Sequence, residues 1–166
     1  MNLRLLTTLV LATTLLLSTL GCSKKQDPVP EPVGTGSYQL DGSLRTCEAK
    51  ITTSTTKAMG GNQNYDYLNV RLTTVPQPPS GAETFVLYFY KLAGQSSSAY
   101  QVFNMELYVK NGVFASTFTN DVTTITPTAD GGFSGTFSAK VPPPTAGTAP
   151  PAYAAITNGV FTNARP

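Results

Sequence analysis

The strongest constraint on the fold is a series of short segments in which apolar and polar residues alternate, each bounded by a turn signal. Tyr67–Thr74 and Val102–Lys110 alternate with a period of two, which turns one face of each strand toward a core and the other toward water. Asn111-Gly112 follows the second segment and is typical of a tight β-hairpin, because both residue types tolerate positive φ angles. Asp41-Gly42 is a similar signal nearer the N-terminus. The pattern predicts antiparallel strands joined by hairpins.

We expect about eight short strands and no helix beyond the N-terminal segment. The expected strands are Tyr38–Leu40, Ser43–Ile51 with Thr52–Lys57 as an extension, Tyr67–Thr74, Thr84–Leu92, Val102–Lys110, Val113–Thr119, Val122–Thr126, Phe133–Val141 and Ala152–Ala164. The last is either one strand with a bulge at Gly159 or a small hairpin. In Val102–Lys110 the alternation turns Phe103, Met105, Leu107 and Val109 inward.

The run at Thr84–Leu92 is apolar on both faces, as expected for a central strand between two packed layers. We therefore predict an all-β fold, an antiparallel β-sandwich of about eight strands. A small antiparallel β-barrel is the alternative, because it needs strands of the same kind.

The N-terminal stretch indicates export. Arg4 precedes an uncharged run, Leu5–Leu20, that is too short and too rich in threonine for a convincing membrane span. After Gly21 and Cys22 comes a polar stretch with prolines at positions 28, 30 and 32, which favours an extended chain. We predict a signal peptide over residues 1–21, a disordered proline-rich tether over 22–36 and a single all-β domain over 37–166.

The residues around Gly21-Cys22 resemble the lipobox of a bacterial lipoprotein, in which a small residue precedes a cysteine that is acylated and becomes the mature N-terminus. The resemblance implies lipid attachment at Cys22 and, because Ser23 follows it, sorting to the outer membrane. Thr19 and Leu20 depart from the usual lipobox pattern. Ordinary cleavage at the same bond, giving a secreted protein with a free thiol, is the alternative. Acyl chains would hold the protein on a membrane without a transmembrane helix.

Three further stretches resemble small all-β lipoprotein domains of Bacteroidota: GSYQLDG at 36–42, GTFS at 135–138 and ITNGVFTN at 156–163. The two lysines after Cys22 and Ser23, with acidic residues soon after, have the same style. No activity is established for such domains. The resemblance therefore implies an envelope location and a fold class, and it transfers no site residue.

Composition excludes several classes of function. The chain has no histidine, which excludes histidine general-base catalysis and leaves Cys47 unable to build a zinc site alone. With Cys22 acylated, Cys47 has no disulfide partner and is expected to be a small buried hydrophobe. The formal net charge is +2 without a basic run, which argues against nucleic acid as a partner. No calcium-loop pattern is present, and no cofactor or metal is predicted.

Two sets of residues are candidates for a site. A carboxylate pair could in principle support glycoside hydrolysis, although a turn or strand-end role also explains each acid; the candidates are Asp66, Glu83, Glu106, Asp121 and Asp130. Outward tyrosines could bind a glycan or a peptide, although packing is their more ordinary role; the candidates are Tyr65, Tyr67, Tyr100, Tyr108 and Tyr153.

The sequence thus predicts a non-enzymatic, lipid-anchored protein of the outer membrane, facing the periplasm or the cell surface, whose domain makes structural or interaction contacts. Its partners would be the membrane, through the lipid, and an envelope protein or glycan. The first alternative is a glycan- or peptide-binding module that uses exposed loop tyrosines. The second alternative is a carboxylate-based hydrolase.

Overall fold

The computed structural model describes residues 33–57, 61–78, 81–143 and 152–166. Within these ranges lie eight strands and one short 3-10 turn: β1 (Gly34–Leu40), β2 (Ser43–Lys57), β3 (Asn64–Thr74), β4 (Thr84–Leu92), η1 (Ser97–Ala99), β5 (Gln101–Val109), β6 (Val113–Pro127), β7 (Phe133–Lys140) and β8 (Ala155–Ala164). The expected signal peptide, Cys22 and most of the expected tether lie outside the described residues. In the part described, no helix is long and apolar enough to cross a bilayer.

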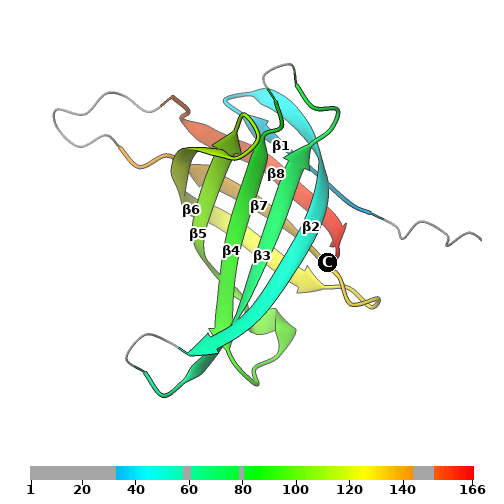
Figure 1. The fold of residues 1–166 in the computed structure, drawn as a ribbon, viewed down its shortest axis with the longest axis vertical. Coiled ribbons are helices and arrows are strands. Elements are labelled where there is room, and N and C mark those ends of the chain that lie inside the picture. Colours follow the sequence, from blue (N-terminus) through cyan, green and yellow to red (C-terminus); the bar gives the residue numbers. More distant parts are fainter. Residues whose placement is uncertain (1–32, 58–60, 79–80, 144–151) are drawn as a thin grey trace, which may run out of the picture. The chain divides into compact units, whose positions relative to one another are not determined.

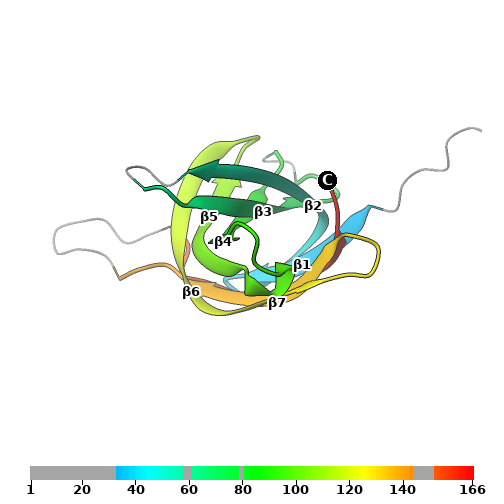
Figure 2. The same ribbon diagram turned by 90° about the horizontal axis from the view of Figure 1, so that it is seen from below.

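The strands form a closed antiparallel barrel in which each strand pairs with its neighbour in the chain (Figures 1 and 2). The first and last strands close it, with Thr35 opposite Thr162 and Leu40 opposite Ile156. The all-β, antiparallel prediction is confirmed, whereas the preference for a sandwich is wrong and the barrel alternative is right. Both architectures bury one face of every strand, so alternation does not distinguish them. What distinguishes them is the pairing of β1 with β8, which leaves neither strand as an open edge.

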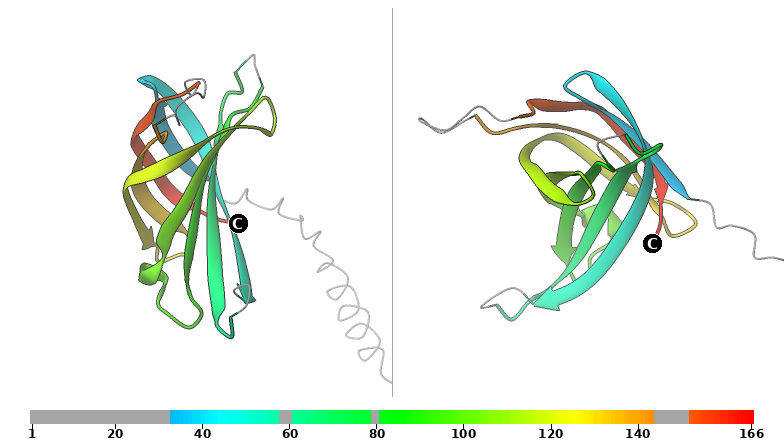
Figure 3. Two further views of the ribbon diagram at one scale, coloured as in Figure 1. Left: turned by 90° about the vertical axis from the view of Figure 1, so that its left-hand side faces the viewer. Right: turned by 45° about the horizontal axis from the view of Figure 1, so that its top comes forward.

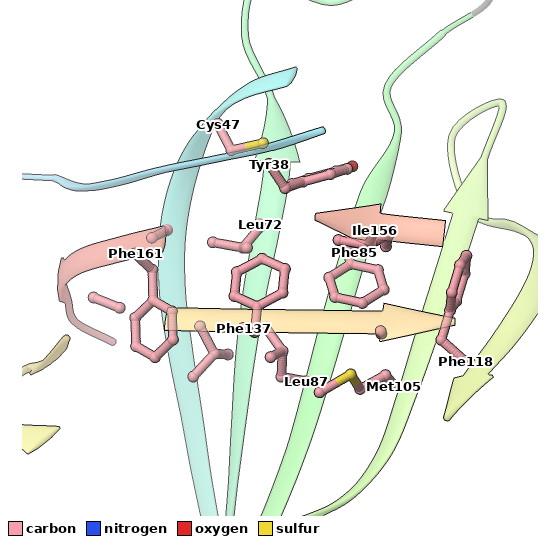
Figure 4. Close-up of a cluster of buried hydrophobic side chains, with 14 of the residues drawn as sticks. Tyr38, Cys47, Leu72, Phe85, Leu87, Met105, Phe118, Phe137, Ile156 and Phe161 are labelled. Carbon is pink, nitrogen blue, oxygen red and sulfur yellow. The ribbon is translucent and has the colours of Figure 1, made fainter. Parts of the chain in front are cut away.

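Side chains fill the interior of the barrel (Figure 4). Phe85 stacks on Phe137 with ring centroids 5.4 Å apart, and Phe118 meets Phe85 edge-on at 5.7 Å. The largest fully buried side chains come from strands β1, β3, β4, β5 and β8: Tyr38, Phe85, Phe89, Phe161, Leu68, Leu72, Leu87, Met105, Leu107, Ile156, Val70 and Val86. All of these except Val86 belong to the core. An eight-stranded barrel is just wide enough to be filled in this way.

Cys47 is buried and free, as the sequence predicts. Burial raises the pKa of its thiol to about 12, with a further contribution from the negative charge of Glu83. The thiol therefore behaves as a small apolar side chain.

Two glycines allow aromatic rings to lie directly against the backbone. A Cβ atom on Gly159 would lie 2.5 Å from the ring of Phe137. A Cβ atom on Gly135 would lie 2.7 Å from the ring of Phe161. Both distances are too short for real contacts, so the absence of a side chain at these positions is part of the core packing.

Two strands, β6 and β8, contain irregularities in their pairing, and these bear on the strands expected from the sequence. The two strands expected at Val113–Thr119 and Val122–Thr126 are one strand, β6, with a register shift between Asn120 and Val122. The first part of β6 pairs with β5 and the second with β7, and the strand bends between them (Figure 3). β8 is a single strand with an irregularity around Asn158, whose φ is 52°, in agreement with the bulge expected at Gly159.

One bulge changes the direction of a side chain. Tyr88 is opposite Asn104, but the next residue, Phe89, is opposite Val102, so Phe103 is an extra residue in β5. An extra residue shifts the alternation of the strand. Phe103 consequently lies on the outside with 53% of its surface exposed, and the prediction that it faces inward is wrong.

Candidate functional site

Seven aromatic side chains gather on the outer surface of β3, β4, β5 and β6, and we call them the aromatic face. Its members are Tyr65, Tyr67, Tyr88, Tyr90, Phe103, Tyr108 and Phe114. They lie outside because the residues that alternate with them, such as Leu68 and Phe89, fill the barrel. The strands that carry them lie side by side in Figure 1.

Phe103 is the centre of the larger part of this face. Its ring centroid lies 5.6 Å from that of Tyr90 and 6.0 Å from those of both Tyr67 and Tyr88. Tyr65 extends the group through a contact of 6.0 Å with Tyr90. These separations are those of ordinary aromatic pairs, so the rings form one continuous surface.

A smaller part of the face joins this group through phenol oxygens. The rings of Tyr108 and Phe114 lie 5.9 Å apart, and Phe114 is 54% exposed. The hydroxyl oxygens of Tyr88 and Tyr108 are 3.5 Å apart, which links the smaller part to the larger one.

Glu106 lies where the two parts meet and accepts three hydrogen bonds. Tyr88 and Tyr108 donate to Oε2 at 2.8 and 2.5 Å, and Asn104 donates through Nδ2 to Oε1 at 2.8 Å. Register explains the grouping, because Val86 is opposite Glu106 while Tyr88 and Thr84 are opposite Asn104 and Tyr108. Side chains on the same face of adjacent strands are close enough to bond in this way.

The carboxyl of Glu106 remains ionised in this setting. Partial burial alone raises its pKa, but the hydrogen bonds from Tyr108, Tyr88 and Asn104 together outweigh burial, and the net pKa lies below its usual value. Burial, followed by the nearby Tyr108 hydroxyl and the bond to Glu106, raises the pKa of the Tyr88 phenol. The site is thus a carboxylate surrounded by three hydrogen-bond donors.

Two hollows border the aromatic face. One, of about 400 Å³, is lined by Arg71, Thr84, Tyr108, Asn111 and Gly112, and we call it the Arg71 hollow. The turn that forms its wall is held in place because Asn111 donates its backbone N–H to the Ala82 carbonyl at 3.2 Å and accepts the Ala82 N–H at Oδ1 at 2.9 Å. The other hollow, of about 350 Å³, lies where β5 and β6 separate and includes Phe103 and Phe118.

A further pocket, of about 420 Å³, lies at the end of the barrel near the β3–β4 connection. Arg45 and Glu83 line it and form an ion pair with 2.6 Å between Nε and Oε2. Tyr38 lies on β1 and belongs to the core. Its hydroxyl is fully buried and has no hydrogen-bond partner in the described ranges. Burial, followed by the charges of Cys47 and Glu83, raises the pKa of Tyr38. A protonated phenol at this position is part of the core.

The five candidate carboxylates have separate partners. Asp66 pairs with Lys91, Glu83 with Arg45, Asp121 with Lys140 and Asp130 with Arg165, while Glu106 has the tyrosines. Among the described residues, no three Cys, Asp or Glu side chains come together as they would around a metal ion. Four of the five candidates are thus each paired with a cation.

The five candidate tyrosines separate into two groups. Tyr65, Tyr67 and Tyr108 belong to the aromatic face, where they lie on strands rather than in loops. Tyr100 packs edge-on against Phe133 at 5.8 Å, and Tyr153 is half-buried against the core.

Four members of the aromatic face are absent from the sequence-based candidates. Tyr88 and Tyr90 could have been found, because they alternate with the inward residues of Thr84–Leu92. Phe103 is turned outward by a bulge, and Phe114 becomes part of the face only through pairing with Tyr108. No local signal in the sequence indicates either of these last two.

Comparison of the chain with protein-family models, with curated proteins and with solved structures found no match. The function of the protein is therefore inferred from the geometry of the aromatic face.

Proposed function

We propose that this protein is a lipid-anchored, non-catalytic component of the outer membrane whose barrel binds a glycan chain along the aromatic face. The observation that carries the proposal is the continuous surface of seven aromatic side chains around the hydrogen-bonded carboxylate of Glu106. Exposed apolar patches rimmed by polar groups are typical of binding sites.

The chemistry of the face suits a carbohydrate. Sugar rings have apolar C–H surfaces that pack on aromatic rings, and hydroxyl groups that need donors and acceptors at the edges of those rings. Phe103 and Phe114 supply exposed rings without polar groups. Tyr88, Tyr108 and Glu106 supply phenol and carboxylate groups between them.

The location favours a chain over a small ligand. In the described part of the protein, the interior of the barrel is occupied by the core side chains, so a ligand has the outer wall available. The aromatic face crosses four adjacent strands, and a hollow borders it on each side. Such a surface can contact several successive units of an extended polymer.

Electrophoresis of the purified protein through gels containing soluble polysaccharides tests this function. We expect at least one polysaccharide to retard the wild type, and Phe103→Ala to weaken that binding roughly 2-fold to 10-fold, the range of a lost aromatic contact. Val122→Ala is the control, because Val122 is 59% exposed on β6 outside the aromatic face. Equal retardation of wild type and Phe103→Ala by every polysaccharide would contradict the proposal.

The anchor needs its own test. Intact mass and membrane fractionation should show acyl mass and outer-membrane association for the wild type, and neither for Cys22→Ala. A soluble, unmodified wild type would instead indicate a secreted protein and would remove the anchor from the proposal.

A further inference from the structure

The distribution of charge around the aromatic face indicates which kind of glycan it suits. Four cations of the described residues are paired with carboxylates: Arg45, Lys91, Lys140 and Arg165. Within the described ranges, four other cations have no carboxylate at salt-bridge distance, namely Lys50, Lys57, Arg71 and Lys110. Three of these, all but Lys57, lie near one end of the aromatic face.

Strand register brings two of the cations together. Lys50 on β2 is directly opposite Arg71 on β3, and both are exposed. Arg71 is opposite Val86 on β4, which is in turn opposite Glu106 on β5. The guanidinium thus belongs to the same row of outward side chains as the carboxylate at the centre of the face.

Donor groups converge in the Arg71 hollow. Besides the guanidinium, the hollow is lined by Thr84, whose hydroxyl shares a 3.2 Å hydrogen bond with that of Thr73, and by Asn111, which is preceded in the turn by Lys110. The Asn111 Oδ1 atom already accepts the Ala82 N–H, which leaves its Nδ2 group as a donor. Tyr108 supplies an aromatic wall and gives its hydroxyl proton to Glu106.

Two acids lie in the same region, and they do not make its net charge negative. Glu48 is opposite Thr73 on the outer surface, and Glu106 is held by its three donors. Cations therefore outnumber acids in this region, three to two. The cations are Lys50, Arg71 and Lys110, and the acids are Glu48 and Glu106. An exposed guanidinium without a carboxylate partner is suited to bidentate binding of a planar anion.

We infer that the polymer bound on the aromatic face is an acidic polysaccharide, with the carboxylate of one uronic acid unit bound by Arg71 in the Arg71 hollow. The sugar rings on either side of that unit pack along the aromatic face. This inference rests on the proposed glycan binding and adds the class of ligand to it.

Titration calorimetry on the full-length protein, purified as it is natively expressed, provides the test. The probes are oligogalacturonate, oligomannuronate and hyaluronan oligosaccharides, each beside its carboxyl-reduced form, in which the acid is converted to an alcohol on the same chain. At least one acidic chain should bind about tenfold or more tightly than its reduced form, the scale expected for a charge-assisted bidentate contact.

Variants of Arg71 test whether this residue causes the preference for the acidic chain over its reduced form. Arg71→Gln should remove most of the difference between the acidic chain and its reduced form, while Arg71→Lys should keep only part of it because an ammonium cannot bind in a bidentate manner. Lys140→Gln is the control, since Lys140 is exposed and lies on β7, a strand that carries no member of the aromatic face. It should change affinity by less than about twofold, because screening weakens the effect of an exposed charge that does not contact the ligand.

The outcomes separate the two proposals. Reduced chains that bind as tightly as acidic ones, or an Arg71→Gln variant with unchanged preference, would overturn the acidic ligand and leave glycan binding in place. If neither acidic nor reduced chains bind, and none of the neutral polysaccharides of the gel panel does, the glycan function itself is overturned. Far-UV circular dichroism of each variant confirms that the barrel has folded.

Discussion

The Tyr88 hydroxyl donates a 2.8 Å hydrogen bond to Glu106 across the β4–β5 ladder, on the outside of a barrel that has a hydrophobic core. Tyr88 and Glu106 are separated by 18 positions in the chain, and pairing of adjacent strands brings them together. With Tyr108 and Asn104, this contact makes an ordered polar centre within the aromatic face.

Replacing Glu106 by Gln should destabilise the barrel. The amide has one acceptor oxygen in place of two, and its NH₂ group would face a donor, so at least one phenol or amide donor loses its partner. Loss of a charge-assisted bond of this kind costs about 1–3 kcal/mol. Urea denaturation measures the difference, and Glu48→Gln, an exposed acid on β2, is the control. Equal stability of the Glu106→Gln variant and the wild type would show that the three hydrogen bonds are not formed in solution.

The contribution of Glu106 should also depend on pH. Its pKa is lowered in the folded protein, so the stabilisation is fully present above the ordinary glutamate pKa of about 4.3 and is lost as pH falls through the lowered value. The difference in unfolding free energy between wild type and Glu106→Gln should therefore shrink below about pH 4. Asp66, whose pKa is also lowered, chiefly by its bond to Lys91, is present in both proteins and cancels. A difference that stays constant between pH 7 and pH 2.5 would contradict this assignment.

Gly159→Ala should be destabilising because of the ring of Phe137. The added Cβ would lie 2.5 Å from that ring, and overpacking in a core costs about 1–3 kcal/mol. Thr162→Ala on the exposed side of the same strand should be nearly neutral. The smaller side chain of Phe137→Leu should reduce the penalty in the double variant, as a double-mutant cycle would measure. Strictly additive effects would show that the two residues do not meet.

The Cys47 thiol should be unreactive in the folded protein. It is 2% exposed, and burial raises its pKa to about 12, so the thiolate that reacts with a disulfide reagent is scarce and inaccessible at pH 8. In the Cys22→Ala variant, a thiol reagent should label almost nothing in buffer and one group per chain in denaturant. Rapid labelling without denaturant would place Cys47 outside the core.

Much of the strand pattern can be read from the sequence. The alternation in Tyr67–Thr74 correctly places Leu68, Val70 and Leu72 in the core, and Asn111-Gly112 forms the expected hairpin, with positive φ at both residues. These features are local, since they follow from the period of a strand and from the φ angles that a turn demands. Of the two possibilities for the last strand, the structure has the single strand with an irregularity around Gly159, and not the hairpin.

The closure of the barrel and the composition of the aromatic face depend on contacts between residues distant in the chain. β1 pairs with β8 although the whole domain separates them, and the alternation of a strand is identical in an open and a closed sheet. Phe103 faces outward because β5 has one more residue than β4 at that point, which only the pairing of the two strands reveals. Glu106 gains its phenol partners from register. Local chemistry thus specifies the strands and turns of this chain, while long-range pairing specifies which side chains meet on its surface.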